Sequence, residues 1–199
     1  MGKESYVDIG WLPNYYQHDT TIYINWSKEA VNNMKNEPHS DLANWEFRCK
    51  KGLVFSKAGI YAPTFRLSTG SIIDSGCNGI FSDNISIVYL LGILCSKLIR
   101  YQFNTYINHT VNAQVDDIKE ISICLNSIAE KQIINFVRSI IENQKQNPLY
   151  DYASNEQNEI DCLVYEAYGL NAEDIHEIEY WYARRYPKLA MANQKNQMC

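Results

Sequence analysis

The sequence is poor in the motifs that mark cofactor-dependent and hydrolytic enzymes. Its nine glycines form no GxGxxG or Walker lysine motif at the start of an expected helix, and no GxSxG nucleophile elbow occurs. The four histidines are scattered along the chain, and none shares a metal-ligand spacing with another. We therefore expect no catalytic residue, no metal site and no cofactor in this chain.

Closely spaced cysteines are also missing. The chain has six cysteines, but no CxxC or other tight metal-ligand spacing. Cys95 and Cys124 lie inside apolar runs. The pattern indicates small buried hydrophobic side chains in a reducing cytoplasm rather than a zinc site.

Long hydrophobic runs are absent. The longest apolar stretch, Ile85–Ile99, is interrupted by Ser86, Gly92, Ser96 and Lys97, so it is too short and too mixed to span a bilayer. The residues after Met1 lead directly into polar sequence without a signal-peptide pattern. We expect no membrane contact and a cytoplasmic location.

Two fragments imitate catalytic motifs. Asn147–Tyr150 reads Asn-Pro-Leu-Tyr, similar to the Asn-Pro-Pro-Tyr motif of amino-methyltransferases, but the second proline is missing and no glycine-rich cofactor loop precedes it. A proline directly after an expected helix is more simply a helix stop. Asp83 with Asp117–Lys119 imitates the acids and lysine of a metal-dependent nuclease, a pattern short enough to arise by chance.

Charge is distributed unevenly along the chain. Residues 151–199 hold nine acids and four bases and account for the whole net charge of −5, whereas residues 1–150 hold fourteen of each. Within that neutral part, Phe47–Ile73 contains five bases and no acid. A nucleic-acid partner therefore remains possible despite the acidic total, because binding depends on the charge of the contacting face.

The segment Trp45–Arg66 interleaves these bases with aromatic residues. Lysine and arginine suit phosphate groups, and arginine also reads guanine edges. The hydroxyls of Ser56 and Thr64 are suited to donate to phosphate oxygens. A solvated strand pair that is basic by chance is an equally good interpretation of this segment alone.

The pattern of residues predicts an α+β fold: a mixed β-sheet with packed helices, followed by a C-terminal helical appendix. We expect domain boundaries that give a sheet-containing domain over 1–126, a helical region over 127–188 and a flexible tail over 189–199. The expected helices begin at Ser27, at Asn84 or Ser86, at Ser127 or Ala129, at Glu156 and at Asn171. The second of them is expected to run to about Phe103, Gly169 is expected to follow the fourth in a left-handed conformation, and Asp174 is expected to form a capping box with Asn171. The expected strands cover residues 21–24, 52–56, 60–67, 71–75 and 118–125, with a turn of positive φ at 76–79.

Motifs follow one another in six segments: Ile24–Trp26, Gly52–Lys57, Gly70–Phe81, Tyr89–Leu98, Asn112–Lys119 and Glu159–Leu170. Taken in this order, they resemble the target-recognition regions of type IIG restriction-modification enzymes and of BREX-type adenine-specific DNA methyltransferases. Gln114–Ile118 and the closing Ile-Asp-x-Leu-Val-Tyr motif are the most specific of them. Cys95 and Ser122 depart from the family pattern, which has asparagine and proline there.

The resemblance implies that this chain is a specificity region that recognises double-stranded DNA. The catalytic domain, with its S-adenosylmethionine, would then precede this region in a longer parent protein, and the parent's methyltransferase half would be a second partner. Candidate base-reading residues are Arg66, Asn108 and Gln114. The residues expected to position phosphates are Lys50, Lys51, Lys57, Arg66, Lys97 and Arg100.

Two other interpretations stay open. The acidic C-terminal region, with Tyr180, Trp181, Tyr182 and Tyr186, would suit a protein-interaction or dimerisation module of a phage-defence system. An exposed aromatic cluster without a basic surface would favour that interpretation. An independent enzyme would need a formed pocket with a perturbed acid or nucleophile, and it is the least favoured of the three.

Overall fold

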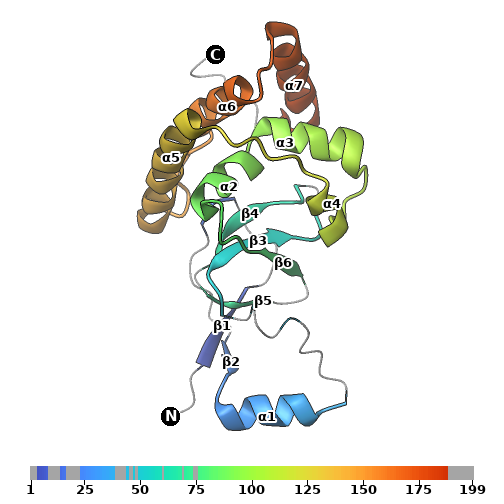
Figure 1. The fold of residues 1–199 in the computed structure, drawn as a ribbon, viewed down its shortest axis with the longest axis vertical. Helices are drawn as coiled ribbons and strands as arrows, with labels where there is room; N and C mark the ends of the chain where they lie inside the picture. The colour runs from blue at the N-terminus through green and yellow to red at the C-terminus, as the bar shows by residue number, and fades with distance from the viewer. Residues whose placement is uncertain are drawn as a thin grey trace.

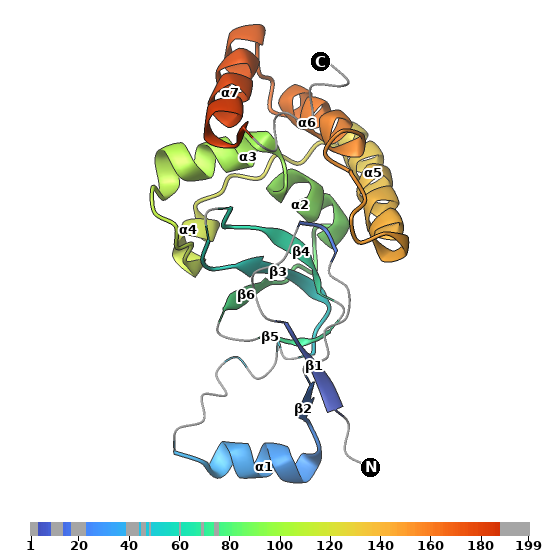
Figure 2. The same cartoon turned by 180° about the vertical axis from the view of Figure 1, so that it is seen from behind.

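The computed structural model describes residues 4–8, 14–16, 23–38, 44, 47, 49–59, 61–68, 70–73 and 76–187. It has an α+β fold, as the sequence predicts. The expected tail, 189–199, lies outside the described residues. Figures 1 and 2 show an elongated arrangement with α1 at one end, the strands in the middle and α5, α6 and α7 toward the other end.

The described strands form two small sheets. An antiparallel sheet has the order β4–β3–β6, and a mixed sheet has the order β2–β1–β5, in which β1 pairs antiparallel with β2 and parallel with β5. In the first sheet, Val54 is paired with Arg66 and Phe55 with Phe65. The strands are β1 (Glu4–Asp8), β2 (Tyr23–Asn25), β3 (Gly52–Ser56), β4 (Phe65–Ser68), β5 (Ile72–Ile73) and β6 (Cys77–Ile80).

Helices supply most of the regular structure. Segment α2 packs on the β3–β4 side of the antiparallel sheet, and α5 and α6 pack in turn on α2, so that one hydrophobic core joins sheet and helices. The helices are α1 (Lys28–Asn36), α2 (Ile87–Leu94), α3 (Lys97–Gln102), the π-helical turn η2 (Phe103–Ile107), α4 (Val115–Lys119), α5 (Ser127–Gln146), α6 (Glu156–Ala167) and α7 (Ala172–Arg185).

Several helix ends agree with the sequence prediction. The Ser27 hydroxyl accepts a hydrogen bond from the Ala30 N–H and begins α1. Gly169 has φ +68° after α6, where a left-handed residue was expected. Asn171 and Asp174 form the predicted capping box of α7.

Residues 118–125 do not form the predicted strand. The Asp117 carboxylate accepts from the Gln114 N–H at 2.8 Å and caps the short helix α4 instead. The extended residues that follow obtain hydrogen bonds from tyrosines: Cys124 N–H donates to the Tyr168 hydroxyl, which donates to the Ser122 carbonyl. Side chains thus satisfy backbone groups that a neighbouring strand would otherwise bond.

Two further predictions are corrected. Residues 77–79, expected as part of a turn with positive φ, lie in β6 and pair with β3, and Gly79 has no positive φ. The helix expected to run unbroken to about Phe103 divides at Ser96, whose hydroxyl caps α3 by accepting from the Ile99 N–H. The α3 N-terminus receives a carboxylate from α6, as described below.

Candidate nucleic-acid interface

The first group of predicted contact residues lies in the loop between β3 and β4 and at its base. At its base, the Ser56 and Thr64 hydroxyls are hydrogen-bonded to one another at 2.9 Å, and the Ser56 N–H donates to the Thr64 carbonyl at 3.0 Å. The Ser56 side chain is buried, and its hydrogen bond to the Thr64 hydroxyl holds the hairpin closed. Lys57 follows directly and is half-buried.

The segment 108–114 lies against this loop. The Ala113 N–H donates to the Lys57 carbonyl at 2.6 Å, and the Gly59 N–H donates to the Val111 carbonyl at 3.1 Å. These two bonds, with the Ala58–Asn112 bridge, fix segments that are about fifty residues apart in the sequence side by side. We call residues 57–59, 61–64 and 108–114 together with the Arg100 side chain the hairpin end.

Asn108 organises the hairpin end from within. Its amide nitrogen donates to the Asn112 carbonyl at 2.9 Å and to the Asp117 carboxylate, and its amide oxygen accepts from Thr110. The Asn108 amide therefore has internal partners for both its donor and its acceptor sides. Gln114, at the start of α4, is exposed.

Arg100 reaches the hairpin end from α3. Its guanidinium donates to the Tyr61 carbonyl at 2.9 Å and lies 5.3 Å from the centre of the Tyr186 ring. Tyr186 ends α7, whose last turn carries the exposed Arg184 and Arg185. Although residues 151–199 are acidic overall, the C-terminal end of α7 is basic and contacts Arg100 and Tyr61 through Tyr186.

Lys50 and Lys51 lie at the opposite end of β3. The Lys50 ammonium is 3.6 Å from the Asp83 carboxylate and packs over the stacked rings of Phe47 and Phe81. Lys51 is exposed. Five residues of extended strand lie between Lys51 and Lys57, a separation of roughly 20 Å, so Lys50 and Lys51 form a second, distinct basic position.

Arg66 and Lys97 are inside the protein. Arg66 has 0% of its surface exposed. Its strand, β4, lies between β3 and the segment at Tyr15, and the Tyr15 backbone is hydrogen-bonded to Phe65 and Leu67, the residues on either side of Arg66. Lys97 is 6% exposed. In this conformation neither side chain has surface to offer a phosphate or a base, contrary to the roles that the sequence analysis assigned to them.

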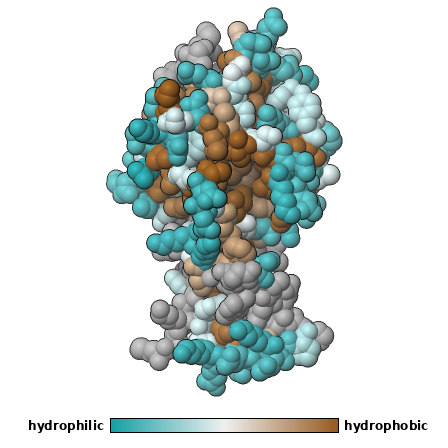
Figure 3. Space-filling model, in the orientation of Figure 1, coloured by the Kyte–Doolittle hydropathy of each residue, from teal (hydrophilic) through white to brown (hydrophobic). Residues whose placement is uncertain are grey.

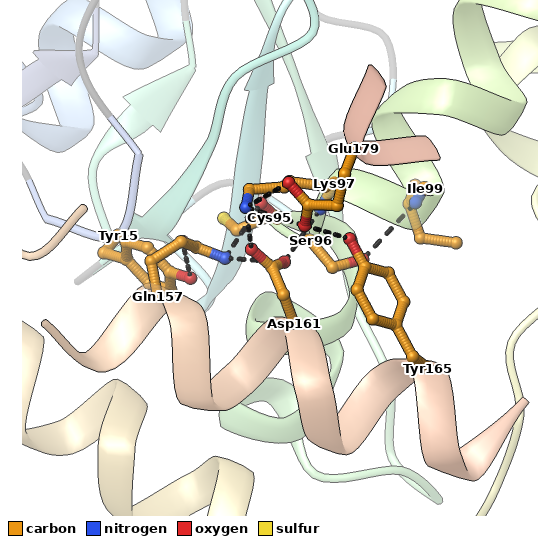
Figure 4. A network of polar contacts seen from close by, with 9 residues as sticks. All are labelled: Tyr15, Cys95, Ser96, Lys97, Ile99, Gln157, Asp161, Tyr165 and Glu179. Atoms are coloured by element: carbon orange, nitrogen blue, oxygen red, sulfur yellow. Dashed lines mark hydrogen bonds and ion pairs between the residues drawn. The ribbon is translucent and has the colours of Figure 1, made fainter. Parts of the chain in front are cut away.

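Figure 4 shows the polar network around Lys97. Its ammonium contacts both Glu179 carboxylate oxygens of α7, at 2.8 and 2.9 Å, and lies 3.6 Å from the Asp161 carboxylate of α6. The Lys97 N–H also donates to Asp161 at 2.9 Å, so this carboxylate caps the N-terminus of α3. Lys97 is therefore the point at which three helices are joined.

Further side chains complete the network. Gln157 donates to Asp161 at 3.1 Å and accepts from the Tyr15 hydroxyl at 2.6 Å, while the Tyr165 hydroxyl donates to Glu179 at 2.9 Å. The sequence contains one indication of this buried network: Asp161 occupies a core-facing position of α6, between Ile160 and Val164. An acid on an otherwise apolar stripe indicates a buried partner.

Burial controls the charges in this network. It raises the pKa of Asp161 to about 6, although the Lys97 ammonium acts in the opposite direction. Burial by itself lowers the pKa of Lys97, but the carboxylates of Asp161 and Glu179 outweigh it and raise that pKa above its usual value. The ammonium therefore stays charged at neutral pH.

Comparison with known proteins gives no further assignment: no family model matches the chain, and no curated protein matches it. Among the described residues, no three His, Cys, Asp or Glu side chains are grouped so that they could hold a metal ion. No helix in the described ranges is both long and apolar enough to cross a membrane.

Proposed function

We propose that this chain recognises double-stranded DNA as the specificity region of an adenine-specific DNA methyltransferase or a fused restriction-modification enzyme. The S-adenosylmethionine-binding catalytic domain would lie outside this chain. The observation that carries the proposal is the hairpin end, where Lys57, Arg100 and the loop built by Asn108 lie together within one hydrogen-bonded group. The ordered motif resemblance supports it independently.

The set of residues proposed to contact DNA is smaller than the set predicted from the sequence. Lys57, Arg100, Gln114 and the basic end of α7 would contact one stretch of DNA, and Lys50 and Lys51 would contact the backbone farther along. Ser56, Thr64 and Asn108 would hold the loop in shape, and Arg66 and Lys97 would act within the core. Phosphate contacts of this kind position a duplex, and base edges supply its sequence information.

The test is binding of a fluorescent duplex by the full chain over a series of salt concentrations. The logarithm of affinity should fall steeply with the logarithm of salt, and Lys57→Glu should weaken binding and reduce that slope by about 1. Lys131→Glu, the same charge change at an exposed site on α5, serves as the matched control. Absent or salt-independent binding by the unaltered chain would overturn the proposal.

A protein-interaction role is the second candidate, and one observation favours it. The segment between α4 and α5 crosses the face drawn in Figure 1, where Figure 3 shows a broad hydrophobic area. In that segment and the first turn of α5, Leu125 and Ile128 are 66% and 76% exposed. The aromatic residues named for this interpretation are less exposed: Tyr180 is exposed, Trp181 and Tyr182 are half-buried, and Tyr186 is buried.

Sedimentation of the chain over a concentration series tests the second candidate. Self-association that Leu125→Glu with Ile128→Glu abolishes would support an interface between copies, because large exposed apolar areas mark interaction surfaces. Leu149→Glu, at a site that is 89% exposed, is the control. A monomer at every concentration would remove dimerisation from consideration.

A further inference from the structure

A series of aromatic rings borders the hairpin end. The ring of Tyr106 contacts Tyr101 with centres 5.9 Å apart, Tyr101 contacts Trp181 at 5.4 Å, and Trp181 contacts Tyr186 at 5.9 Å. Tyr186 in turn contacts Tyr61 at 5.7 Å. Side chains from η2, α3, the C-terminal end of α7 and the β3–β4 loop thus form one continuous row.

The two ends of this row are exposed, although its middle is packed. Tyr106 is 71% exposed and Tyr61 is 40% exposed, whereas Tyr186 is 4% exposed. Tyr106 is held in place, because its ring meets the edge of Tyr101 and the two hydroxyls lie 3.5 Å apart. Core packing explains the interior rings, but it does not explain why the protein fixes a large aromatic side chain at its surface.

Cationic and polar groups lie along the same row. The Arg100 guanidinium lies over the Tyr186 ring and donates to the Tyr61 backbone. Asn104 donates to the Arg100 carbonyl at 2.9 Å, and His109 is exposed next to the Asn108 loop. Aromatic faces combined with positive charge are the elements from which proteins build binding sites for unpaired nucleotides, since every base has a face that can stack.

We propose that Tyr106 and Tyr61 stack on unpaired bases of DNA at the hairpin end. The inference rests on the proposed function and specifies it further: the preferred partner is DNA with locally opened base pairs rather than an intact duplex. In a closed duplex the base faces are covered by their neighbours. An exposed tyrosine therefore gains a stacking contact only where bases are already unstacked or have been displaced.

The experiment measures binding of the full chain to three labelled DNAs of equal length at one salt concentration: an intact duplex, the same duplex with two mismatched central pairs, and a single strand. The mismatched duplex should bind more tightly than the intact one. Tyr106→Ala should weaken binding to the mismatched duplex about 5- to 150-fold, the range expected for one lost stacking contact, and should leave the intact duplex nearly unchanged.

Two variants and a spectroscopic readout separate stacking from other effects. Tyr106→Phe keeps the ring and should retain the preference, and Tyr23→Ala, at a tyrosine of β2 that is 54% exposed and lies away from the hairpin end, should have no effect. A 2-aminopurine base at the mismatch should be quenched on binding, and Tyr106→Ala should remove that quenching. Thermal unfolding confirms that each variant is folded.

The outcomes distinguish this inference from the proposed function. If the chain binds the intact duplex with a steep salt dependence but shows no preference for mismatched DNA, or if Tyr106→Ala changes nothing, the stacking role is wrong and duplex recognition stands. If the chain binds none of the three DNAs, both proposals fail.

Discussion

The Asp161 carboxylate is held in the protein interior. It lies near the Lys97 ammonium and accepts hydrogen bonds from the Lys97 backbone N–H of α3 and from the Gln157 side chain. Glu179 lies on the far side of the same ammonium and repels the Asp161 charge. Desolvation is the largest of these effects, so the folded protein binds a proton at Asp161 more readily than the unfolded chain does.

This environment predicts a pH dependence of stability. The folded pKa, about 6, lies above the ordinary value of 3.8, so between these two values the folded state holds more protons than the unfolded state. The free energy of unfolding contributed by Asp161 is therefore greatest below pH 4 and falls as the pH rises toward 6. Each pH unit between the two pKa values corresponds to about 1.4 kcal/mol.

Urea unfolding of the chain and of Asp161→Asn, at intervals from pH 4 to pH 7, measures this contribution. The difference in unfolding free energy between the two proteins should change steadily across that range, because asparagine does not titrate. Asp116→Asn is the control, since Asp116 is exposed and Lys119 lowers its pKa. A difference that stays constant from pH 4 to pH 7 would show that Asp161 keeps its ordinary pKa.

In the core, helix α2 packs closely against α5 at Gly92. Gly92 faces α5, and a Cβ at this position would overlap the Ile133 side chain and lie 3.0 Å from a methyl of Val137. Ile133 and Val137 are both 0% exposed. The missing side chain of Gly92 therefore sets the distance between the two helices.

Gly92→Ala should lower the free energy of unfolding by about 1–3 kcal/mol through overpacking, offset by roughly 1 kcal/mol of better helix propensity. Ile133→Ala alone should cost about 2–5 kcal/mol by leaving a cavity. Thermal and denaturant unfolding of both variants and of the double variant completes the cycle. The double variant should lose less unfolding free energy than the two single variants lose in sum, because the shortened side chain at 133 leaves room for the new methyl group. Simple additivity would mean that Gly92 does not contact Ile133.

Over the whole molecule, one core extends across the boundary that the sequence suggested at residue 126. Side chains of α5 and α6, including Val137 and Ile160, are fully buried together with Leu91 of α2 and Leu53 of β3. The division into a recognition domain and a helical region remains a functional proposal. The packing gives neither part a separate core of its own.

A chain that ends at residue 126 should consequently fail to fold cooperatively. It would expose the apolar faces of α2 and β3, which α5 and α6 cover in the complete structure. Circular dichroism during heating and binding of a hydrophobic dye provide the measurement. A chain that ends at residue 187 retains every described element and is the control. A sharp transition in the shorter chain would show that residues 1–126 are an independent domain.

Local sequence signals predicted the helix ends well. Ser27, Gly169 and the Asn171–Asp174 pair act through bonds within four residues, so their effect can be derived without knowledge of the rest of the chain. The Gln114–Asp117 cap of α4 is of the same kind, but it was not predicted, and the weak alternation over 118–125 suggested a strand instead. Within the candidate site, the basic segment that contains Lys57 could also be predicted from the local sequence.

By itself, the sequence determined the fold class, the apolar stripes and most helix caps, because these depend on periodicity and on contacts between near neighbours. Only the tertiary structure decided which charged residues are exposed. Lys97 and Arg66 lie in segments that look like solvated surface, yet Glu179, Asp161 and the residues around Tyr15 enclose them from distant parts of the chain. Burial of a charge depends on partners supplied by other elements, and a local pattern does not contain them.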